Sequence, residues 1–167
     1  IFMSSIKVNG EGNGQKLPYT EIDVPVPQGA YAISKYEAEV GLMEIGDQTG
    51  LKTVVARPPL VYGPGVGANF LRLMKVVDSG FPLPFGSVKN KRSLIYVGNL
   101  VDAVLQCLKN PPVAGKTYLI SDGVDVSMSE LITLLSEALQ VPPRLISVPK
   151  IFLQTFGFLT GQRAAVE

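Results

Sequence analysis

The sequence predicts an α/β fold, because two short apolar segments of strand character enclose a longer segment of helical character. Residues 1–8 form an apolar run with two hydroxyl side chains, a pattern typical of a buried parallel strand. Residues 51–56 form a second run rich in β-branched side chains, which favours the next strand of a sheet. Between them, residues 30–48 carry apolar side chains at helical spacing. This order indicates strands connected through a helix.

Proline and glycine mark the limits of these elements. Residues 57–59 read Arg-Pro-Pro and end the second strand, because proline cannot continue the hydrogen-bond ladder. About twenty residues after the first strand contain several Gly and Pro, which predicts a loop over or beside the end of that strand. Residues 81–86 contain two prolines and are predicted to be neither a helix nor a central strand.

The rest of the chain predicts further helices and one more strand. Asn69 suits the N-cap or first turn of a helix, and Ser127 with Glu130 forms a capping-box pattern. Cys107 lies on an apolar helix face, where we expect a buried, unreactive thiol. The expected helices span 69–77, 99–110, 127–140 and 148–159, and the expected strand spans 116–121.

Composition excludes several kinds of site. The net charge is +1 and Lys and Arg are scattered, so nothing points to nucleic acid or an anionic membrane as a partner. The absence of histidine and the single cysteine exclude the usual metal ligand sets, a Ser-His-Asp triad and a disulfide framework. No apolar run approaches about 20 residues and no cleavable signal opens the chain, so we expect no membrane span and a cytoplasmic location. Catalysis must then come from Tyr, Lys, Ser or carboxylates.

Tyr31 and Lys35 form the first candidate pair for chemistry. They are four residues apart in the predicted helix, so the phenol and the ammonium lie on one face and can share one bound molecule. A positive charge beside a phenol favours the phenolate, so such a pair can act as a general acid and base. The alternative is a surface tyrosine and lysine on an amphipathic helix. The helix also carries Glu37, Glu39 and Glu44, an acidic face that solvation explains.

Two other motifs accompany this pair. Ser4 and Ser5 close the first strand, where open α/β sheets bind ligands, and Ser5 is the better placed; the alternative is that both only end the strand. Residues 57–65 read Arg-Pro-Pro-Leu-Val-Tyr-Gly-Pro-Gly. In this order and spacing, the motifs resemble the extended short-chain dehydrogenase/reductase family, in particular its nucleotide-sugar 4-epimerases, dehydratases and 4-keto-reductases. The similarity continues through residues 91–94 and 99–102 to the end of the chain.

The resemblance implies a division of the chain. Residues 1–66 resemble the second half of a doubly wound parallel, Rossmann-like sheet that carries the catalytic Ser, Tyr and Lys. Residues 67–167 resemble a mostly helical, incomplete substrate domain. The family's GxxGxxG turn, which binds the dinucleotide, belongs to a first half with no match here. The glycine clusters at 10–14 and 63–67 are predicted loops, because one has the wrong spacing and the other contains a proline. We therefore expect both ends to be cut and the chain to be inactive alone.

The resemblance also implies NAD or NADP as the cofactor. Tyr31 matches the residue that removes or returns the proton of a sugar hydroxyl, and Lys35 matches the residue that holds the cofactor ribose. Both therefore contact the cofactor, and Pro58 lies at its nicotinamide end. Ser5 matches the residue that fixes the reacting sugar oxygen. The residues that read the ribose 2′ position belong to the unmatched half, so NAD and NADP stay alternatives.

The substrate that the resemblance implies is a nucleoside-diphosphate sugar, a UDP- or dTDP-hexose. Leu60 matches a position near the sugar, and Leu83 and Phe85 match positions that hold the base. Asn69 and Arg92 match positions that touch the diphosphate, for which a guanidinium provides paired contacts. The alternatives are a helix cap for Asn69 and a solvated basic turn for Arg92.

The implied activity is 4-epimerisation of a nucleotide sugar such as UDP-glucose by transient hydride transfer at C4, in a protein that forms a homodimer through helix 30–48. A 4-keto-reductase shares all of these residues and is the alternative. A dehydratase is disfavoured, because Ile6 and Lys7 stand where those enzymes carry an Asp-Glu pair. A non-catalytic dinucleotide-sensing protein on the same fold is a second hypothesis, and a structural fragment that binds nothing by itself is a third.

Overall fold

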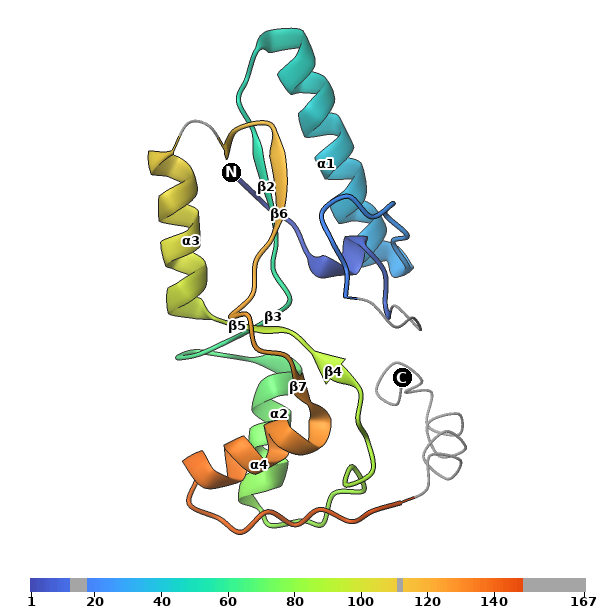
Figure 1. Ribbon diagram of the computed structural model, residues 1–167, viewed down its shortest axis with the longest axis vertical. Helices are drawn as coiled ribbons and strands as arrows, with labels where there is room; N and C mark the ends of the chain where they lie inside the picture. The colour runs from blue at the N-terminus through green and yellow to red at the C-terminus, as the bar shows by residue number, and fades with distance from the viewer. Residues whose placement is uncertain (13–17, 111–112, 149–167) are drawn as a thin grey trace. The chain divides into compact units, whose positions relative to one another are not determined.

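The computed structural model describes residues 1–12, 18–110 and 113–148, and the chain divides into two compact units (Figure 1). The first unit comprises Ile1–Gly63 and Leu94–Gly123, and the second comprises Pro64–Ser93 and Val124–Glu167. The chain returns to the first unit at Leu94, and residues 116–119 then pair as a strand in the sheet of that unit. The sequence does not predict this return. The assignment of cofactor and substrate to separate parts of the chain stays a prediction.

The first unit is built on a three-stranded parallel sheet in the order β1-β2-β6. β1 spans Phe2–Met3, β2 spans Val54–Arg57 and β6 spans Lys116–Leu119, and both outer strands pair with β2 in parallel. All four residues of β2 are buried, as expected for the central strand of a parallel sheet. The parallel sheet confirms the predicted α/β fold.

Two helices of this unit are seen on opposite sides of the sheet in Figure 1. α1 spans Gly29–Thr49, close to the predicted 30–48, and α3 spans Val97–Lys109. α1 ends at Gly50, which adopts a positive φ of 73° and donates its N–H to the Gly46 carbonyl. Glycine favours this left-handed C-terminal cap because it has no Cβ. Helices on both faces of a parallel sheet are typical of doubly wound folds.

The first strand is shorter than predicted. Only Phe2–Met3 pair as a strand, and Ile6–Val8 form a short 3-10 helix, η1. The Ser5 hydroxyl accepts the Lys7 backbone N–H at 3.3 Å, and this local bond offers the backbone an alternative to the ladder. The prediction of a strand over 1–8 is therefore wrong in its second half.

A second sheet in the first unit pairs β3, Leu60–Tyr62, with β5, Leu94–Tyr96, in parallel. These strands are short, with three residues each. The buried side chain of Ile95 is 1% exposed and contributes to the core of the unit.

Asp122 fixes the end of this small sheet. Its carboxylate accepts hydrogen bonds from the Tyr62 hydroxyl at 3.0 Å, the Tyr96 N–H at 3.0 Å and the Asn99 amide at 2.8 Å. Burial opposes ionisation, but these hydrogen bonds outweigh it and lower the pKa of Asp122. Burial and the same carboxylate raise the pKa of Tyr62. The helix predicted to begin at Asn99 begins at Val97. Asn99 therefore lies in the first turn of α3, where its side-chain amide donates to Asp122.

The second unit packs α2, Ala68–Asp78, against α4, Met128–Ala138. The predicted capping box is confirmed: the Ser127 hydroxyl accepts the Glu130 N–H at 3.1 Å, and the Glu130 carboxylate accepts the Ser127 N–H at 2.7 Å. The apolar core of the two helices consists of Phe70, Val77, Leu131, Ile132 and Leu135.

Two short pairings complete the second unit. β4, Lys91–Arg92, pairs antiparallel with β7, Val126–Ser127. Residues 81–86 form neither a helix nor a regular strand, as predicted. Within them, the Leu83 N–H donates to the Arg144 carbonyl and the Leu83 carbonyl accepts the Ile146 N–H, both at 2.8 Å. The helix predicted over 148–159 lies outside the described residues except for its first residue.

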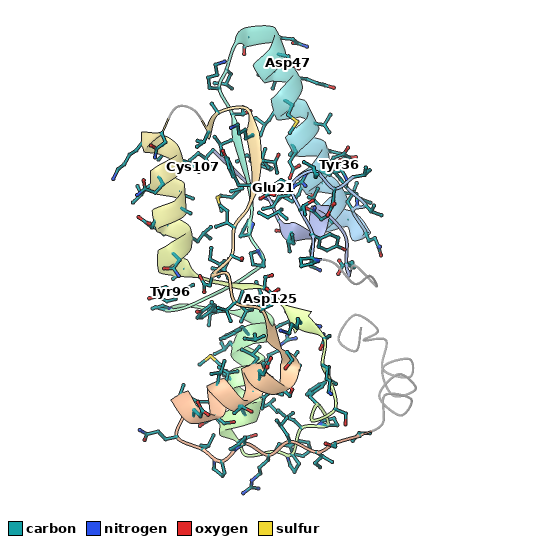
Figure 2. The ribbon with its side chains drawn as sticks, viewed as in Figure 1. Glu21, Tyr36, Asp47, Tyr96, Cys107 and Asp125 are labelled. Atoms are coloured by element: carbon teal, nitrogen blue, oxygen red, sulfur yellow. The ribbon has the colours of Figure 1, made fainter. Side chains whose placement is uncertain are left out.

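Cys107 is a free thiol on α3 and is half-buried (Figure 2). The prediction of a buried thiol is wrong, because α3 has no fully buried residue. Among the described residues, no helix is long and apolar enough to cross a membrane, and no three His, Cys, Asp or Glu side chains gather as metal ligands.

Candidate active site

Lys35 is held against the strand that leads to Ser5. Its Nζ donates to the Met3 carbonyl oxygen at 3.0 Å and lies 5.0 Å from the centre of the Phe2 ring, a cation–π contact. Met3 ends β1 and Ser5 lies two residues further on, so this contact places a lysine of α1 beside the strand end that carries the predicted catalytic serine. The contact with Met3 uses one of three ammonium N–H groups, which leaves two for a ligand.

Tyr31 lies four residues before Lys35 on α1 and therefore on the same face of the helix. The residue is 57% exposed, so its phenol is accessible to a ligand. The Ser34 hydroxyl donates to the Tyr31 carbonyl oxygen at 2.9 Å, a bond within the helix that leaves the phenol unaffected. The structure thus presents an accessible phenol and a fixed ammonium on one helix face.

Ser5 is half-buried and is the N-cap of η1. Its hydroxyl accepts the Lys7 N–H, so its own O–H remains able to donate to a substrate oxygen. Ser4 is only 5% exposed, and its Oγ has no hydrogen-bond partner within the described part of the chain. Ser5 is the more accessible of the two serines, which is what a substrate contact requires.

A buried ionic cluster that sequence reasoning missed lies beside these residues. Arg57 donates to the Glu39 carboxylate through Nε at 3.0 Å and through Nη2 at 2.5 Å, and to the Asn9 side-chain oxygen through Nη1 at 3.0 Å. Glu39, Asn9 and Arg57 are 1%, 2% and 4% exposed. The expectation that Glu39 belongs to a solvated acidic face is wrong, because it pairs with Arg57 inside the unit.

A signal for this cluster is present in the sequence. Tyr31, Lys35 and Glu39 follow one another at intervals of four residues, so they share one helix face. If that face carries the catalytic pair toward the sheet, a carboxylate one turn further on is also directed inward. Arg57, at the end of a buried strand, then supplies the opposite charge that a buried carboxylate needs.

Pro58 and Leu60 continue the chain after this cluster. Pro58 is buried, and its carbonyl accepts the Ile6 N–H at 3.0 Å, which joins the end of β2 to η1. Leu60 begins β3 and is 46% exposed. Both lie in the first unit, as do the three predicted catalytic residues.

The other four predicted substrate residues lie in the second unit. Asn69 is exposed in the first turn of α2, where Gly67 and not Asn69 is the N-cap. Arg92 is half-buried on β4, and Phe85 is half-buried in the turn that follows Leu83. Leu83 itself is 8% exposed.

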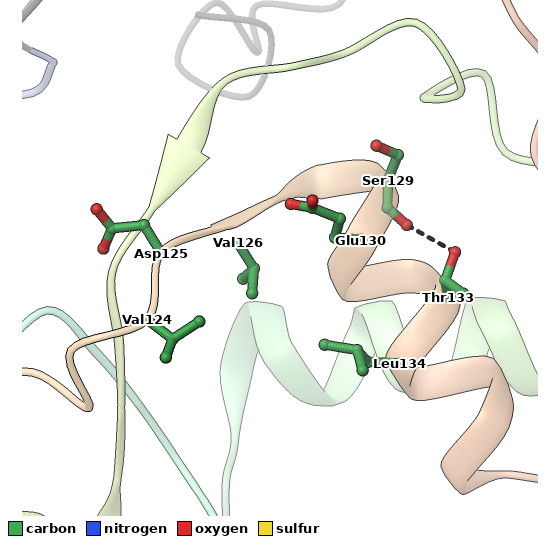
Figure 3. A pocket seen from close by; sticks show the side chains of 7 residues that line it. All are labelled: Val124, Asp125, Val126, Ser129, Glu130, Thr133 and Leu134. Carbon is green, nitrogen blue, oxygen red and sulfur yellow. Dashed lines mark hydrogen bonds between the residues drawn. The ribbon is translucent and has the colours of Figure 1, made fainter.

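The second unit also has an open hollow of about 380 Å³ (Figure 3). None of the predicted substrate residues lines it. Both of its carboxylates are already engaged, Asp125 by the Ser93 hydroxyl and Glu130 by the Ser127 N–H. We therefore assign it no ligand. Its lining consists of Val124, Asp125, Val126, Ser129, Glu130, Thr133 and Leu134.

The fold and the site together define a Rossmann-like protein with a tyrosine–lysine pair on one face of a helix and a serine two residues after the end of a parallel strand. Residues 1–121 match the NAD dependent epimerase/dehydratase family. The match covers most of the chain, and the chain belongs to this family.

Individual relatives include epimerases and reductases. The chain is 44% identical over 168 residues to UDP-glucose 4-epimerase of Vibrio cholerae, an alignment that covers 100% of this chain and 51% of that protein. It is 29% identical over 157 residues to GDP-6-deoxy-D-mannose reductase of Pseudomonas aeruginosa, which covers 89% of this chain and 51% of that protein. The chain thus spans about half the length of the curated relatives it matches.

A solved structure of the same fold carries a cofactor. RMD from Pseudomonas aeruginosa complexed with NADPH superimposes with a TM-score of 0.73 at 27% identity, over 87% of this chain and 53% of that chain. Two other solved structures of the same fold have NAD bound. NAD or NADP is therefore the cofactor of the family, as predicted.

Proposed function

We propose that this chain is the catalytic part of an NAD(P)-dependent nucleoside-diphosphate-sugar 4-epimerase that acts on a UDP-hexose such as UDP-glucose. The observation that carries the proposal is the bond from Lys35 Nζ to the Met3 carbonyl, which joins the helix of Tyr31 and Lys35 to the end of β1, two residues before Ser5. Family membership and the similarity to the Vibrio cholerae enzyme support it. The activity is expected of the complete protein, meaning a polypeptide that carries this chain together with a dinucleotide-binding half.

The donor groups of the first unit fit the ribose and nicotinamide part of the cofactor. Lys35 has two N–H groups left for ribose hydroxyls, and the exposed phenol of Tyr31 lies on the same helix face. Pro58 is apolar and buried at the end of β2, which suits the proposed contact with a flat ring. When bound, NAD(P) would supply a hydride acceptor and donor for the sugar C4.

Tyr31 is the proton-transfer group in this proposal. Its phenol oxygen would take the proton of the C4 hydroxyl as that carbon is oxidised, which gives a 4-keto sugar. It would return the proton to the same oxygen as the 4-keto sugar is reduced from the opposite face, so atoms and charge balance. The Lys35 ammonium shares the helix face of Tyr31, and Ser5 would donate its hydroxyl proton to the sugar oxygen. Proton transfer from a positioned group accelerates a reaction by roughly a hundredfold to ten thousandfold.

The second unit would bind the nucleotide. The Arg92 guanidinium suits a paired contact with the diphosphate, and Asn69 offers an exposed amide at the first turn of α2. Leu83 and Phe85 would hold the uracil or thymine, and the two backbone bonds of Leu83 fix that segment. The leucine at position 60 would lie near the sugar.

The proposal also includes a cytoplasmic homodimer joined through α1. Ile33, Val40 and Met43 on this helix are 42%, 38% and 43% exposed. Exposed apolar side chains on one helix suit contact with a second copy. Light scattering of the complete protein should give the mass of two chains, and a monomer would remove this part of the proposal.

A 4-keto-reductase is the second candidate, and the similarity to GDP-6-deoxy-D-mannose reductase favours it. Both reactions need a tyrosine, a lysine and a serine at C4. They differ in redox balance, because an epimerase returns the hydride to the sugar whereas a reductase consumes one NAD(P)H per product.

The deciding experiment incubates the complete protein with UDP-glucose or UDP-galactose and a small amount of NAD. We expect interconversion of the two sugars with no net change in NADH absorbance. Stoichiometric oxidation of NAD(P)H with a 4-keto sugar nucleotide would favour the reductase. If neither UDP- nor dTDP-hexoses react in either assay, the proposed activity is wrong.

A further inference from the structure

The buried cluster of Arg57, Glu39 and Asn9 has no part in the proton transfer described above. It is fully connected: all three guanidinium nitrogens of Arg57 donate, and both Glu39 oxygens accept. The amide of Asn9 also donates to the Thr20 carbonyl at 3.2 Å. The cluster therefore joins α1, the end of β2, the residue after η1 and the following loop.

Each member of the cluster lies close along the chain to a site residue. Glu39 follows Lys35 by four residues on the same face of α1, and Arg57 immediately precedes Pro58. Asn9 follows Ser5 by four residues, at the end of η1. The cluster thus connects the three segments that carry the proposed catalytic and cofactor contacts.

Energetics favour a role in geometry over a role in bulk stability. Removing two charges from water is costly, so a buried ion pair is often no more stabilising than apolar residues of the same size. A guanidinium that bonds one carboxylate with two N–H groups and an amide with a third is instead directionally restrictive. Such a cluster allows little relative displacement of the segments it joins.

We propose that Arg57, Glu39 and Asn9 are positioning residues that hold the Tyr31–Lys35 face of α1 in register with Ser5 and Pro58. The inference rests on the proposed function for its catalytic consequence, while the positioning itself concerns only the protein. The bonds that depend on it are those from Ser4 N–H to the Ala56 carbonyl, at 2.7 Å, and from Ile6 N–H to the Pro58 carbonyl, at 3.0 Å.

The test compares Arg57→Lys and Asn9→Ala in the complete protein. Lysine keeps the charge but cannot form the paired bonds, and alanine at position 9 removes one bond while the ion pair stays. We expect kcat to fall by about tenfold to a hundredfold for Arg57→Lys, because small displacements of reacting groups cost that much. KM for the sugar nucleotide should change by less than about threefold, because the nucleotide contacts are elsewhere. Asn9→Ala should show the same pattern with a smaller loss.

Amide hydrogen exchange provides a readout that does not require activity. Both variants should exchange faster at the Ser4 and Ile6 amides, while the control Ile132→Val in α4 should not. In an active protein the proposal requires both the loss of kcat and the faster exchange, and the absence of either overturns it. If the unsubstituted protein converts no sugar, the proposed function is wrong. The positioning inference then depends only on whether the Ser4 and Ile6 amides exchange faster in the variants. If Arg57→Lys does not fold, Asn9→Ala decides in the same way.

Discussion

The Lys35 ammonium and the Met3 carbonyl oxygen lie 3.0 Å apart although the two residues are 32 positions apart in the chain. The acceptor is a backbone oxygen, so the contact depends on the path of β1 and not on the side chain at position 3. It fixes the ammonium on the first unit before any ligand is bound. In the catalytic role proposed for Lys35, an ammonium that is already in place need not be ordered during the reaction, which lowers the entropic part of the barrier.

The first prediction concerns the phenol of Tyr31. In the complete protein, Tyr31→Phe should lower kcat by at least about a hundredfold, because it removes the proton-transfer group and little else. Binding of the sugar nucleotide, measured by calorimetry, should stay nearly unchanged. Turnover at the original rate would exclude Tyr31 as the acid and base.

Tyr36 provides the matched control for this variant. It lies on the same helix one residue after Lys35, away from the face of the pair, and is half-buried (Figure 2). Tyr36→Phe should keep kcat within about twofold, since it removes the same atom outside the site. An equal loss in both variants would indicate damage to α1 and not to a catalytic group.

The second prediction concerns the guanidinium of Arg92. Arg92→Ala should weaken UDP or dTDP binding by about 1.5–3 kcal/mol, the scale of hydrogen bonds to charged groups. The chemical step should be less affected, because the diphosphate is remote from C4. Lys89→Ala is the control, because Lys89 is an exposed cation in the loop just before β4. Equal affinities in the two variants, measured by calorimetry, would favour a solvated basic turn.

The third prediction concerns Asp122 and acid stability. Its hydrogen bonds lower its pKa in the folded state, so it contributes stability at pH values above the ordinary aspartate pKa of about 3.9. This contribution is lost as the pH falls through the lowered pKa, because the unfolded chain binds the proton first.

Asp122→Asn should therefore lower the free energy of unfolding of the complete protein at neutral pH by about 1–2 kcal/mol, because the site is half-buried. The difference from the unsubstituted protein should shrink below about pH 4 in urea titrations. Asp47→Asn, at an exposed position near the end of α1, is the control and should show no such trend. A difference that is constant from neutral to acid pH would show that the Asp122 charge does not stabilise the fold.

Features that depend on neighbouring residues were predictable from the sequence. The helix over 30–48 and the capping box of Ser127 and Glu130 follow from local spacing, and the structure has both. The predicted first strand is longer than the observed one, Phe2–Met3. An apolar run does not reveal that the Ser5 hydroxyl caps a 3-10 helix at Ile6–Val8.

Features that depend on distant partners were missed. The sequence presents Arg57 as part of a motif and Glu39 as one of several helix carboxylates, and neither position predicts that the two form a buried pair across 18 positions. The pairing of β6 with β2 likewise joins segments far apart in the chain, which local patterns do not reveal. Charge and apolar periodicity along one helix do not show which of its side chains another segment of the chain covers.

The last prediction concerns the isolated 167-residue chain. A dinucleotide is held mainly where backbone N–H groups of a Gly-rich turn and a helix N-terminus meet its pyrophosphate. The first unit supplies the ribose and nicotinamide contacts proposed for Lys35 and Pro58 but, within the described residues, no such turn beside β1.

In the described structure β1 pairs only with β2, so it is an edge strand that can pair with another chain. Apolar side chains on both flanking helices are also open to solvent: Ile45 is 47% exposed and Leu108 is 66% exposed. We therefore expect the isolated chain to bind neither NAD(H) nor NADP(H) measurably, to leave nucleotide sugars unoxidised, and to associate or aggregate. Calorimetric titration beside light scattering tests both parts, and micromolar binding by a clean monomer would place the cofactor site within these residues.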